Sequence, residues 1–183
     1  MRDVIEIATK RLKLRGVRMS DAQRIAQLCG DPSVGRNLAM TPVPYLNVAA
    51  EGWVMITLAR QGRHFVFAVE QPGEGLIGMI GAHPRGDDGS FEIGYWFGRP
   101  YWGRGLGSEA VGAFVAQARA LGPLEAGHFV DNAASGRLLE KVGFAYTGEI
   151  KPMFSLGRGE SVQCKRMALA PVNADRQRAE LVH

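Results

Sequence analysis

Only two cysteines, Cys29 and Cys164, occur among the 183 residues, and they form no Cys-x-x-Cys pair. Together with only four scattered histidines, this excludes a disulfide framework and a cysteine-rich zinc site. We expect two buried free thiols and no metal. No hydrophobic run approaches the length of a membrane span, and the first residues lack the charged-then-apolar layout of a secretory signal. These absences predict a cytoplasmic protein that does not contact a membrane.

The charge and length of the chain narrow the class of protein further. Residues 1–170 suit one domain, and residues 171–183, which lack a strong apolar pattern, predict a disordered C-terminal tail. A net charge of +4 suits an anionic partner, either nucleic acid or a phosphate-bearing small molecule. The one basic run, residues 10–15, alternates basic and apolar residues. That pattern is more typical of a half-solvated strand than of an RNA-binding patch, so we expect no direct nucleic-acid contact.

Hydrophobic periodicity predicts an α+β fold of about seven strands and four helices. Strands are expected at residues 11–18, 64–70, 76–83, 91–97, 124–131, 144–150 and 162–169. Helices are expected after a capping box formed by Ser20 and Gln23, from Asn47 to about residue 60, at 104–121 and at 133–142. Three prolines predict a loop at residues 31–44.

The stretch 91–110 runs from an aromatic and β-branched strand into a helix that begins among Gly103, Gly105 and Gly107. Unpaired backbone N–H groups at a helix start, aligned with the positive end of the helix dipole, suit a phosphate or pyrophosphate. A glycine-rich turn can also be purely structural. Neither a P-loop nor a dinucleotide fingerprint is present, because the required Lys-Ser/Thr and the G-x-G-x-x-G spacing are missing. The loop therefore predicts an anion site of another kind.

The sequence Trp102-Gly103-Arg104-Gly105-Leu106-Gly107 resembles the acyl-CoA site of the GNAT acetyltransferase superfamily, whose signature is Arg/Gln-x-x-Gly-x-Gly/Ala. Trp102 stands where the superfamily usually has Arg or Gln. The aromatic-Trp-Gly-x-Gly form, followed by Glu-Ala, is similar to the RimJ/RimL-type branch of ribosomal-protein N-terminal acetyltransferases. A second segment, residues 130–144, resembles that branch's Asn-x-x-Ser…Gly-Phe segment.

The resemblance implies a GNAT fold, in which a mostly antiparallel sheet is flanked by helices and its fourth and fifth strands diverge. It also implies that acetyl-CoA is the co-substrate. The pantetheine arm is then expected along the main chain of the fourth strand, and the pyrophosphate against the amides of the glycine loop. The expected cofactor-binding residues are Trp96, Phe97, Gly98, Trp102, Gly103, Arg104, Gly105, Leu106, Gly107, Ser108, Asn132 and Ser135.

Three side chains are candidates for catalysis. Glu92 interrupts an apolar strand beside the expected acyl site, and related enzymes often place a glutamate there, although such a residue can equally face solvent. His83 is a second candidate base because it titrates near neutrality. Water is a third candidate base, because an α-amino group with a pKa of about 7.7–8.0 is partly neutral at pH 7 and needs no strong base. By resemblance to RimL-type enzymes, Ser135 is the candidate acid for the leaving thiolate and Asn132 a pantetheine contact, yet both are also common helix-start residues.

By this resemblance the chain is expected to transfer an acetyl group from acetyl-CoA to a primary amine by direct attack in a ternary complex. The expected acceptor is the α-amino group of a protein or peptide, a ribosomal protein being one candidate. The alternatives are a small amine (an amino acid, a polyamine or an antibiotic), a non-catalytic acyl-CoA-binding module, or a ribosome-associated RNA-binding protein. The chain is expected to be a monomer or a homodimer. Two positions depart from the relatives: Leu139 replaces a common tyrosine acid, and Phe154 replaces a RimL-type glutamate.

Overall fold

The computed structural model describes residues 6–60 and 64–170, so the expected tail at 171–183 lies outside the described residues. The strands are β1 (Ile7–Ala8), β2 (Lys13–Gly16), β3 (Phe65–Gln71), β4 (Gly75–Arg85), β5 (Ser90–Phe97), β6 (Leu124–Phe129), β7 (Phe144–Ser155) and β8 (Glu160–Leu169). The helices are α1 (Ala22–Cys29), α2 (Pro32–Gly35), α3 (Asn47–Ala59), α4 (Leu106–Ala118) and α5 (Ala133–Lys141). The expected α+β order is confirmed, with one additional short strand, β1, and one additional short helix, α2.

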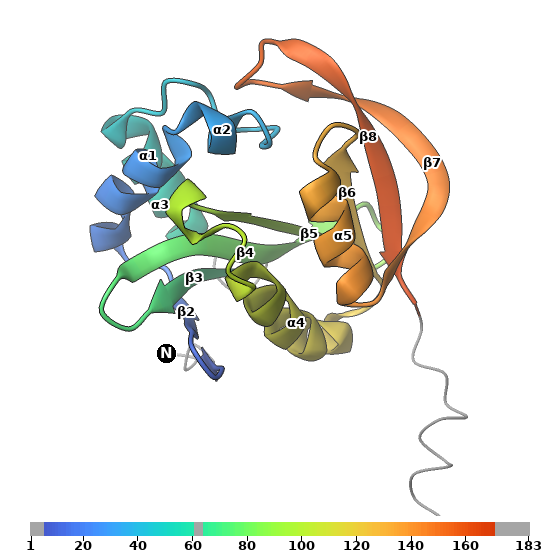
Figure 1. Cartoon of the computed structure of the whole chain (residues 1–183), viewed down its shortest axis with the longest axis horizontal. Helices are drawn as coiled ribbons and strands as arrows, with labels where there is room; N and C mark the ends of the chain where they lie inside the picture. Colours follow the sequence, from blue (N-terminus) through green and yellow to red (C-terminus); the bar gives the residue numbers. More distant parts are fainter. Residues whose placement is uncertain (1–5, 61–63, 171–183) are drawn as a thin grey trace, which may run out of the picture.

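All eight strands form one sheet in the order β1-β2-β3-β4-β5-β6-β8-β7. Neighbouring strands pair antiparallel, except that β5 and β6 run parallel. In Figure 1, α1, α2 and α3 lie above β4 and β5, whereas α4 lies below them. The core lies between these layers, and its fully buried side chains include Leu14, Ile25, Ile77, Ile80, Leu106 and Val111.

The starts of the first two helices differ from the sequence prediction. The predicted capping box is wrong, because a single 3₁₀ turn at Met19–Asp21 precedes α1, and the Asp21 carboxylate accepts the Arg18 N–H at 2.8 Å. A carboxylate at this position satisfies the free N–H more strongly than a serine hydroxyl would. The uninterrupted loop predicted at 31–44 is also wrong. Asp31 caps α2 by accepting the Ser33 N–H at 2.8 Å, and Pro32 occupies the first helical turn, where a missing N–H costs nothing.

One basic residue of the run is buried inside the protein, and the other basic residues reach solvent. Arg15 is only 5% exposed, and its guanidinium donates to both carboxylate oxygens of Asp21, at 2.8 and 2.9 Å, and to Glu70 at 2.5 Å. The prediction of a half-solvated strand is therefore wrong at Arg15, because two carboxylates from other elements cover it. Lys10 and Arg11 are exposed, and the partly exposed Lys13 pairs with Glu6 at 2.8 Å, so the prediction holds for these members of the run.

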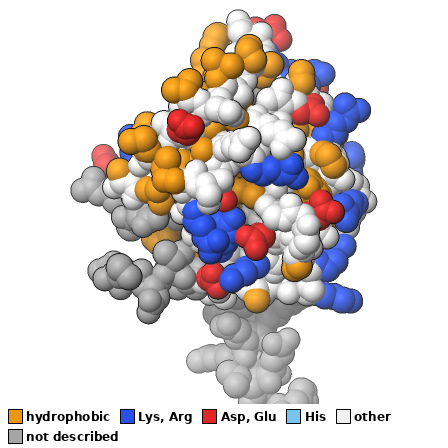
Figure 2. Space-filling view, turned by 90° about the vertical axis from the view of Figure 1, so that its left-hand side faces the viewer, with side chains coloured by type: hydrophobic (Ala, Val, Ile, Leu, Met, Phe, Trp, Pro, Cys, Tyr) orange, Lys and Arg blue, Asp and Glu red, His pale blue; other side chains and the backbone are white. Residues whose placement is uncertain are grey.

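Helix α3 leaves much of its apolar surface uncovered. It buries Ala50 and Val54, whereas Val48, Met55 and Ile56 are exposed. Figure 2, which views the side of the molecule at the left of Figure 1, shows hydrophobic side chains gathered over its upper and left parts. Among the helices that the structure describes, none is long and apolar enough to cross a membrane.

Candidate active site

A gap opens in the sheet where β5 and β6 separate. The two strands pair only at three positions, Phe91 with Leu124, Glu92 with Glu125 and Ile93 with Ala126, and beyond Ile93 they diverge as predicted. The main chain of residues 94–97 therefore has no partner on the β6 side. A cavity of 1230 Å³ includes this gap and is lined by residues from α1, β4, β5, α4, β6, α5, β7 and β8.

Side chains of β5 alternate between the two faces of the sheet. Positions 92 and 94 belong to one face of the sheet, which carries the Glu92 side chain and is open at Gly94. The His83 side chain lies on the same face, because His83 pairs with Glu92 across β4 and β5. Tyr95 and Phe97 project to the opposite face, toward α5 and α4. The cavity therefore has one compartment beside His83 and Glu92 and another beside the starts of α4 and α5.

The glycine loop at the start of α4 requires glycine for two different reasons. Gly103 and Gly105 have φ values of +71° and +74°, which L-residues rarely adopt. Gly107 instead permits close packing, because a Cβ there would lie 3.0 Å from Leu138 and 3.3 Å from the Phe97 ring. All three glycines line the cavity, so the first amides of α4 are accessible from it.

Trp102, which departs from the family signature, ties this loop to β5. Its indole N–H donates to the Phe97 carbonyl at 2.6 Å. The Arg104 guanidinium lies over the Tyr101 ring, 5.9 Å from its centroid, and Leu106 is buried in the core. Because the Leu106 side chain is buried, this residue can offer only its backbone N–H to the pyrophosphate. A direct contact between the Arg104 guanidinium and a phosphate stays a prediction.

Thr9 and Arg11, near the N-terminus, hold the same loop in place through hydrogen bonds. The sequence analysis did not predict these contacts. The Glu109 carboxylate in the first turn of α4 accepts from the Arg11 N–H at 2.7 Å, from Arg11 Nε at 2.6 Å and from the Thr9 hydroxyl at 2.6 Å. Arg11 also donates to the Arg104 carbonyl at 3.0 Å. Partial burial raises the pKa of Glu109, but hydrogen bonds from Thr9 and Arg11 outweigh it and lower this pKa below its ordinary value. Glu109 therefore stays ionised and holds the loop.

Ser135 and Asn132 lie at the start of α5, as the sequence predicts. Asn132 is the N-cap, and its Oδ1 accepts the Ser135 N–H at 3.2 Å. The Ser135 hydroxyl lies 2.8 Å from the Tyr95 hydroxyl, so the two side chains join α5 to β5. Burial raises the pKa of Tyr95 to about 12, although the hydrogen bond with Ser135 acts in the opposite direction. The phenol therefore stays protonated at neutral pH. Tyr95 was not predicted, although its place directly before the candidate segment Trp96–Gly98 was a usable signal.

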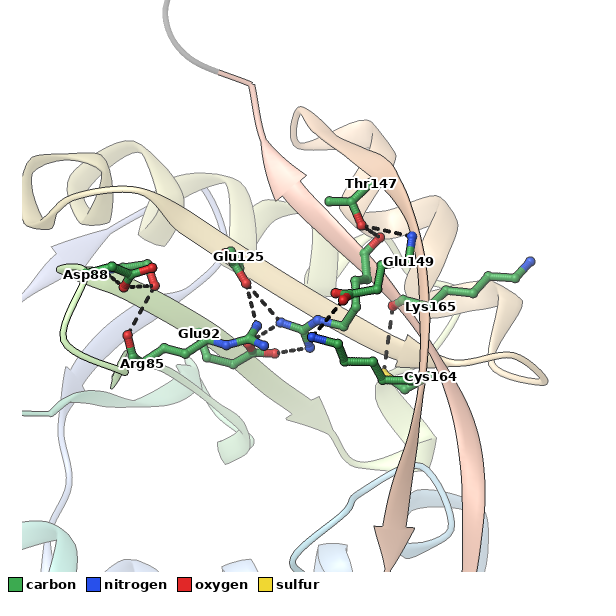
Figure 3. A network of polar contacts seen from close by, with 11 residues as sticks. Arg85, Asp88, Glu92, Glu125, Thr147, Glu149, Cys164 and Lys165 are labelled. Atoms are coloured by element: carbon green, nitrogen blue, oxygen red, sulfur yellow. Dashed lines mark hydrogen bonds and ion pairs between the residues drawn. The ribbon is translucent and has the colours of Figure 1, made fainter.

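Glu92, the first candidate base, is the centre of a four-residue ion-pair network (Figure 3). Its Oε1 accepts from Arg166 Nη1 at 2.7 Å, and its Oε2 accepts from Arg166 Nη2 and from Arg85 Nη1, the latter at 3.0 Å. Glu125 accepts from Arg85 and, at 3.4 Å, from Arg166. Both oxygens of Glu92 are thus engaged by guanidinium groups. Arg85 comes from the neighbouring strand β4, whereas Arg166 comes from β8, 74 residues away, which is too far along the chain for sequence reasoning to pair it with β5.

The chain was compared with known proteins. Residues 11–145 match the family described as the acetyltransferase (GNAT) domain. Over 150 residues the chain is 31% identical to a protein of Bacillus licheniformis named "Uncharacterized N-acetyltransferase p20", covering 78% of this chain and 84% of that one. The chain belongs to the GNAT acetyltransferase family.

Solved acetyltransferases share the fold of this GNAT protein. A Salmonella typhimurium acetyltransferase that modifies the N-terminal serine of the 50S ribosomal subunit protein L7/L12 is 18% identical, with a TM-score of 0.76, covering 92% of this chain and 100% of that one. The microcin C7 self-immunity acetyltransferase MccE, solved in complex with acetyl-CoA and AMP, is 14% identical, with a TM-score of 0.74, covering 89% and 94%. At these identities the likeness concerns the fold, and it confirms the expected GNAT architecture.

His83, the second candidate base of this acetyltransferase, lies beside another histidine. Its Nδ1 is 2.9 Å from Nδ1 of His64. Burial lowers the pKa of His83 below its ordinary value, and His64 lowers it further, while Glu92 acts in the opposite direction. The His83 ring is therefore neutral at neutral pH and lines the cavity.

Both thiols of the acetyltransferase are buried, as predicted, and both line the cavity. Burial raises the pKa of Cys29 to about 12 and also raises the pKa of Cys164. Protonated thiols are poor nucleophiles. Across residues 6–60 and 64–170, no three His, Cys, Asp or Glu side chains gather closely enough to hold a metal ion.

The β7–β8 hairpin of the acetyltransferase closes one wall of the cavity. In Figure 1 its tip reaches toward the segment after α2. The Leu156 N–H donates to the Ala39 carbonyl at 2.8 Å, and the Ser155 hydroxyl donates to the Leu38 carbonyl at 3.1 Å. Arg158 donates to both carboxylate oxygens of Asp131, at 2.7 and 2.9 Å. The wall is therefore fixed to the rest of the protein by several directional contacts.

Proposed function

We propose that this acetyltransferase transfers the acetyl group of acetyl-CoA to the α-amino group of a protein or peptide, by direct attack within a ternary complex. One observation carries the proposal: a single cavity contains both the glycine loop at the start of α4 and the sheet face that carries His83 on β4 and Glu92 and Gly94 on β5. An acyl donor on the first and an amine on the second would meet at the open edge of β5. Holding two reactants in this way replaces a bimolecular encounter.

The donor side fits acetyl-CoA. The glycine loop offers helix-start amides to the pyrophosphate, and the open edge of residues 94–97 offers main-chain groups to the pantetheine arm. When bound, acetyl-CoA supplies the activated thioester. An N–H on the open edge of β5 would stabilise the oxyanion that develops during attack, and Ser135 lies on the α5 side to protonate the sulfur.

The charges of the cavity support an acceptor with one amine rather than a polycation. Glu92 is the only Asp or Glu among the described residues that line the cavity, against the four basic residues Arg85, Arg137, Lys141 and Arg166. Both oxygens of Glu92 are already bonded to arginines. A polyamine or an aminoglycoside would therefore find no free carboxylate there. The N-terminal serine named as the target of the Salmonella enzyme agrees with an α-amino acceptor.

Direct attack is supported by the state of the two thiols. Cys29 and Cys164 are the cavity's only cysteines, and burial keeps both protonated. An acyl-cysteine intermediate would need one of them as a thiolate. The amine is therefore the nucleophile that this cavity is suited to present.

A parallel acceptor screen tests the proposed function. Release of CoA is measured with peptides that have free N-termini, with the same peptides N-terminally blocked but carrying lysine, with amino acids, and with a polyamine and an aminoglycoside. We expect free N-termini to react about 100-fold faster than lysine side chains near pH 7, because lysine's pKa of about 10.4 leaves far less neutral amine. A preference for the polyamine or the aminoglycoside would contradict the acceptor class. Tight acetyl-CoA binding with no acceptor would favour the non-catalytic module.

The hydroxyl pair of Tyr95 and Ser135 gives a second prediction. The 2.8 Å contact lets the more acidic phenol donate to Ser135 Oγ, which leaves the serine proton free for the departing sulfur. We expect Tyr95→Phe and Ser135→Ala each to lower kcat by about 10- to 100-fold, without changing the KM for acetyl-CoA. The double variant should be no slower than Ser135→Ala alone, because the phenol acts through the serine. Additive losses would show instead that the two hydroxyls act independently.

A further inference from the structure

His64 and His83 form a pair that the proposed function does not yet use. Their Nδ1 atoms are 2.9 Å apart and their ring centroids 5.2 Å apart, with the rings inclined by 54°. A nitrogen–nitrogen contact this short holds one hydrogen, which one ring donates and the other accepts. When His83 donates from Nδ1, its Nε2 carries a lone pair and can act as a base.

The free nitrogen of His83 lies over the floor of the cavity. A Cβ placed on Gly81 would be 3.2 Å from His83 Nε2, so the ring leans over Gly81. Gly81 pairs with Gly94 on β5, where a Cβ would meet nothing within 4 Å. Space for an acceptor therefore lies directly beside His83 Nε2, on the strand whose edge opens into the gap.

Of the two candidate bases on this face of the sheet, His83 has a free lone pair and Glu92 does not. Glu92 pairs with it across β4 and β5, but both oxygens of that carboxylate are engaged by Arg85 and Arg166. Burial and His64 keep the pKa of His83 below its ordinary value despite Glu92. His64 is only partly buried, so its ring can exchange protons with solvent.

We propose that His83 Nε2 accepts the proton of the attacking amine and that His64 Nδ1 accepts the proton of His83 Nδ1, so that the two rings form a relay to solvent. As the amine's N–C bond forms, its N–H bond breaks toward His83 Nε2, and His64 releases a proton from Nε2 to water. The C–S bond then breaks, and its electron pair on sulfur takes a proton at Ser135, which water replaces. His83 is the catalytic residue and His64 a positioning residue. The relay rests on the proposed function, since it needs an amine acceptor.

The test is the pH dependence of kcat between about pH 5 and 9, with a free-N-terminus peptide and saturating acetyl-CoA. The acidic limb of this profile is the fall of kcat as the pH decreases and the base becomes protonated. Protonation of the acceptor's own α-amino group, with a pKa of about 7.7–8.0, lowers the rate at acidic pH in every variant. In His83→Gln we expect kcat at pH 7 to fall by about 10-fold or more and the additional acidic limb that reports His83 to disappear, while acetyl-CoA still raises the melting temperature. In His64→Ala the limb should move to higher pH, because one cause of the lowered His83 pKa is removed. In Glu92→Gln it should move to lower pH, because Glu92 raises that pKa. A merely structural role for His64 would lower kcat equally at every pH.

His128 offers a matched control. It is a buried histidine of the same cavity, but Nδ1 contacts the Phe129 carbonyl at 2.8 Å and Nε2 the Tyr146 hydroxyl at 3.0 Å. His128→Asn should leave the position of the acidic limb unchanged. Imidazole added to His83→Ala should restore turnover, which separates lost chemistry from lost folding.

Three outcomes would overturn the relay. Loss of the acidic limb in Glu92→Gln with its retention in His83→Gln would make Glu92 the base. A wild type that acetylates the peptide with no acidic limb beyond that of the amine would overturn the relay alone. A wild type that binds acetyl-CoA and acetylates no acceptor would overturn the proposed function and the relay with it.

Discussion

Gly105→Val is expected to lose acetyl-CoA affinity by about 100-fold or more, which would remove the rise in melting temperature that the ligand produces. Gly105 is the N-cap of α4 at a φ of +74°, where a β-branched residue is strongly disfavoured. Relief of that strain would rotate the peptide units that present the helix-start amides to the pyrophosphate. Thermal denaturation with and without acetyl-CoA, supported by calorimetric titration, measures the effect.

Gly73→Val is the matched control for this loop. Gly73 has a φ of +83° and, like Gly105, no backbone within 4 Å of an added Cβ, but it lies in the turn between β3 and β4. We expect a comparable drop in melting temperature from backbone strain, with the rise on adding acetyl-CoA retained. A full ligand-induced rise in Gly105→Val would show that the glycine loop does not hold the pyrophosphate.

Gly94→Val is expected to lower kcat/KM for the acceptor by about 100-fold or more while acetyl-CoA binding persists. A Cβ on Gly94 would meet nothing within 4 Å, and β-branched residues suit strands, so the protein should fold normally. The side chain would instead occupy the floor beside His83 that the amine must reach. Steady-state kinetics with varied acceptor, together with thermal shift by acetyl-CoA, separate the two effects.

A graded series makes this second prediction stricter. Gly94→Ala adds one carbon to the same floor and should give a smaller loss than Gly94→Val, with an unchanged melting temperature for both. An unchanged kcat/KM in Gly94→Val would place the acceptor elsewhere in the cavity. Equal losses of acetyl-CoA binding and turnover would show that Gly94 serves the donor instead.

Features that depend on neighbouring residues were predictable from the sequence. The helix after residue 20, the helix that follows Asn132 and the glycine loop before α4 are all found as expected. Each reflects a local rule of periodicity, capping or backbone conformation. The candidate site residues lie along the backbone of β5 and at the starts of two helices, and their roles stay predictions.

Features that depend on distant contacts were not predictable. The pairs His64–His83 and Tyr95–Ser135 and the Glu92–Arg166 contact join residues 19, 40 and 74 positions apart, and no periodicity marks such partners. The length of β7 was underestimated for a related reason. A strand was expected to end at residue 150, but β7 continues through Pro152 to Ser155, because it is the edge strand, where a missing N–H leaves no partner unsatisfied.

The divergence of β5 from β6 also affects how this family can change during evolution. Along residues 94–97 the main-chain groups that β6 leaves unpaired are present in every amino acid. Substitution of Trp96 or Phe97 therefore removes no main-chain donor or acceptor from that edge, so these two positions can change as long as the path of the backbone is kept. A fold shared with MccE at 14% identity is compatible with such a constraint.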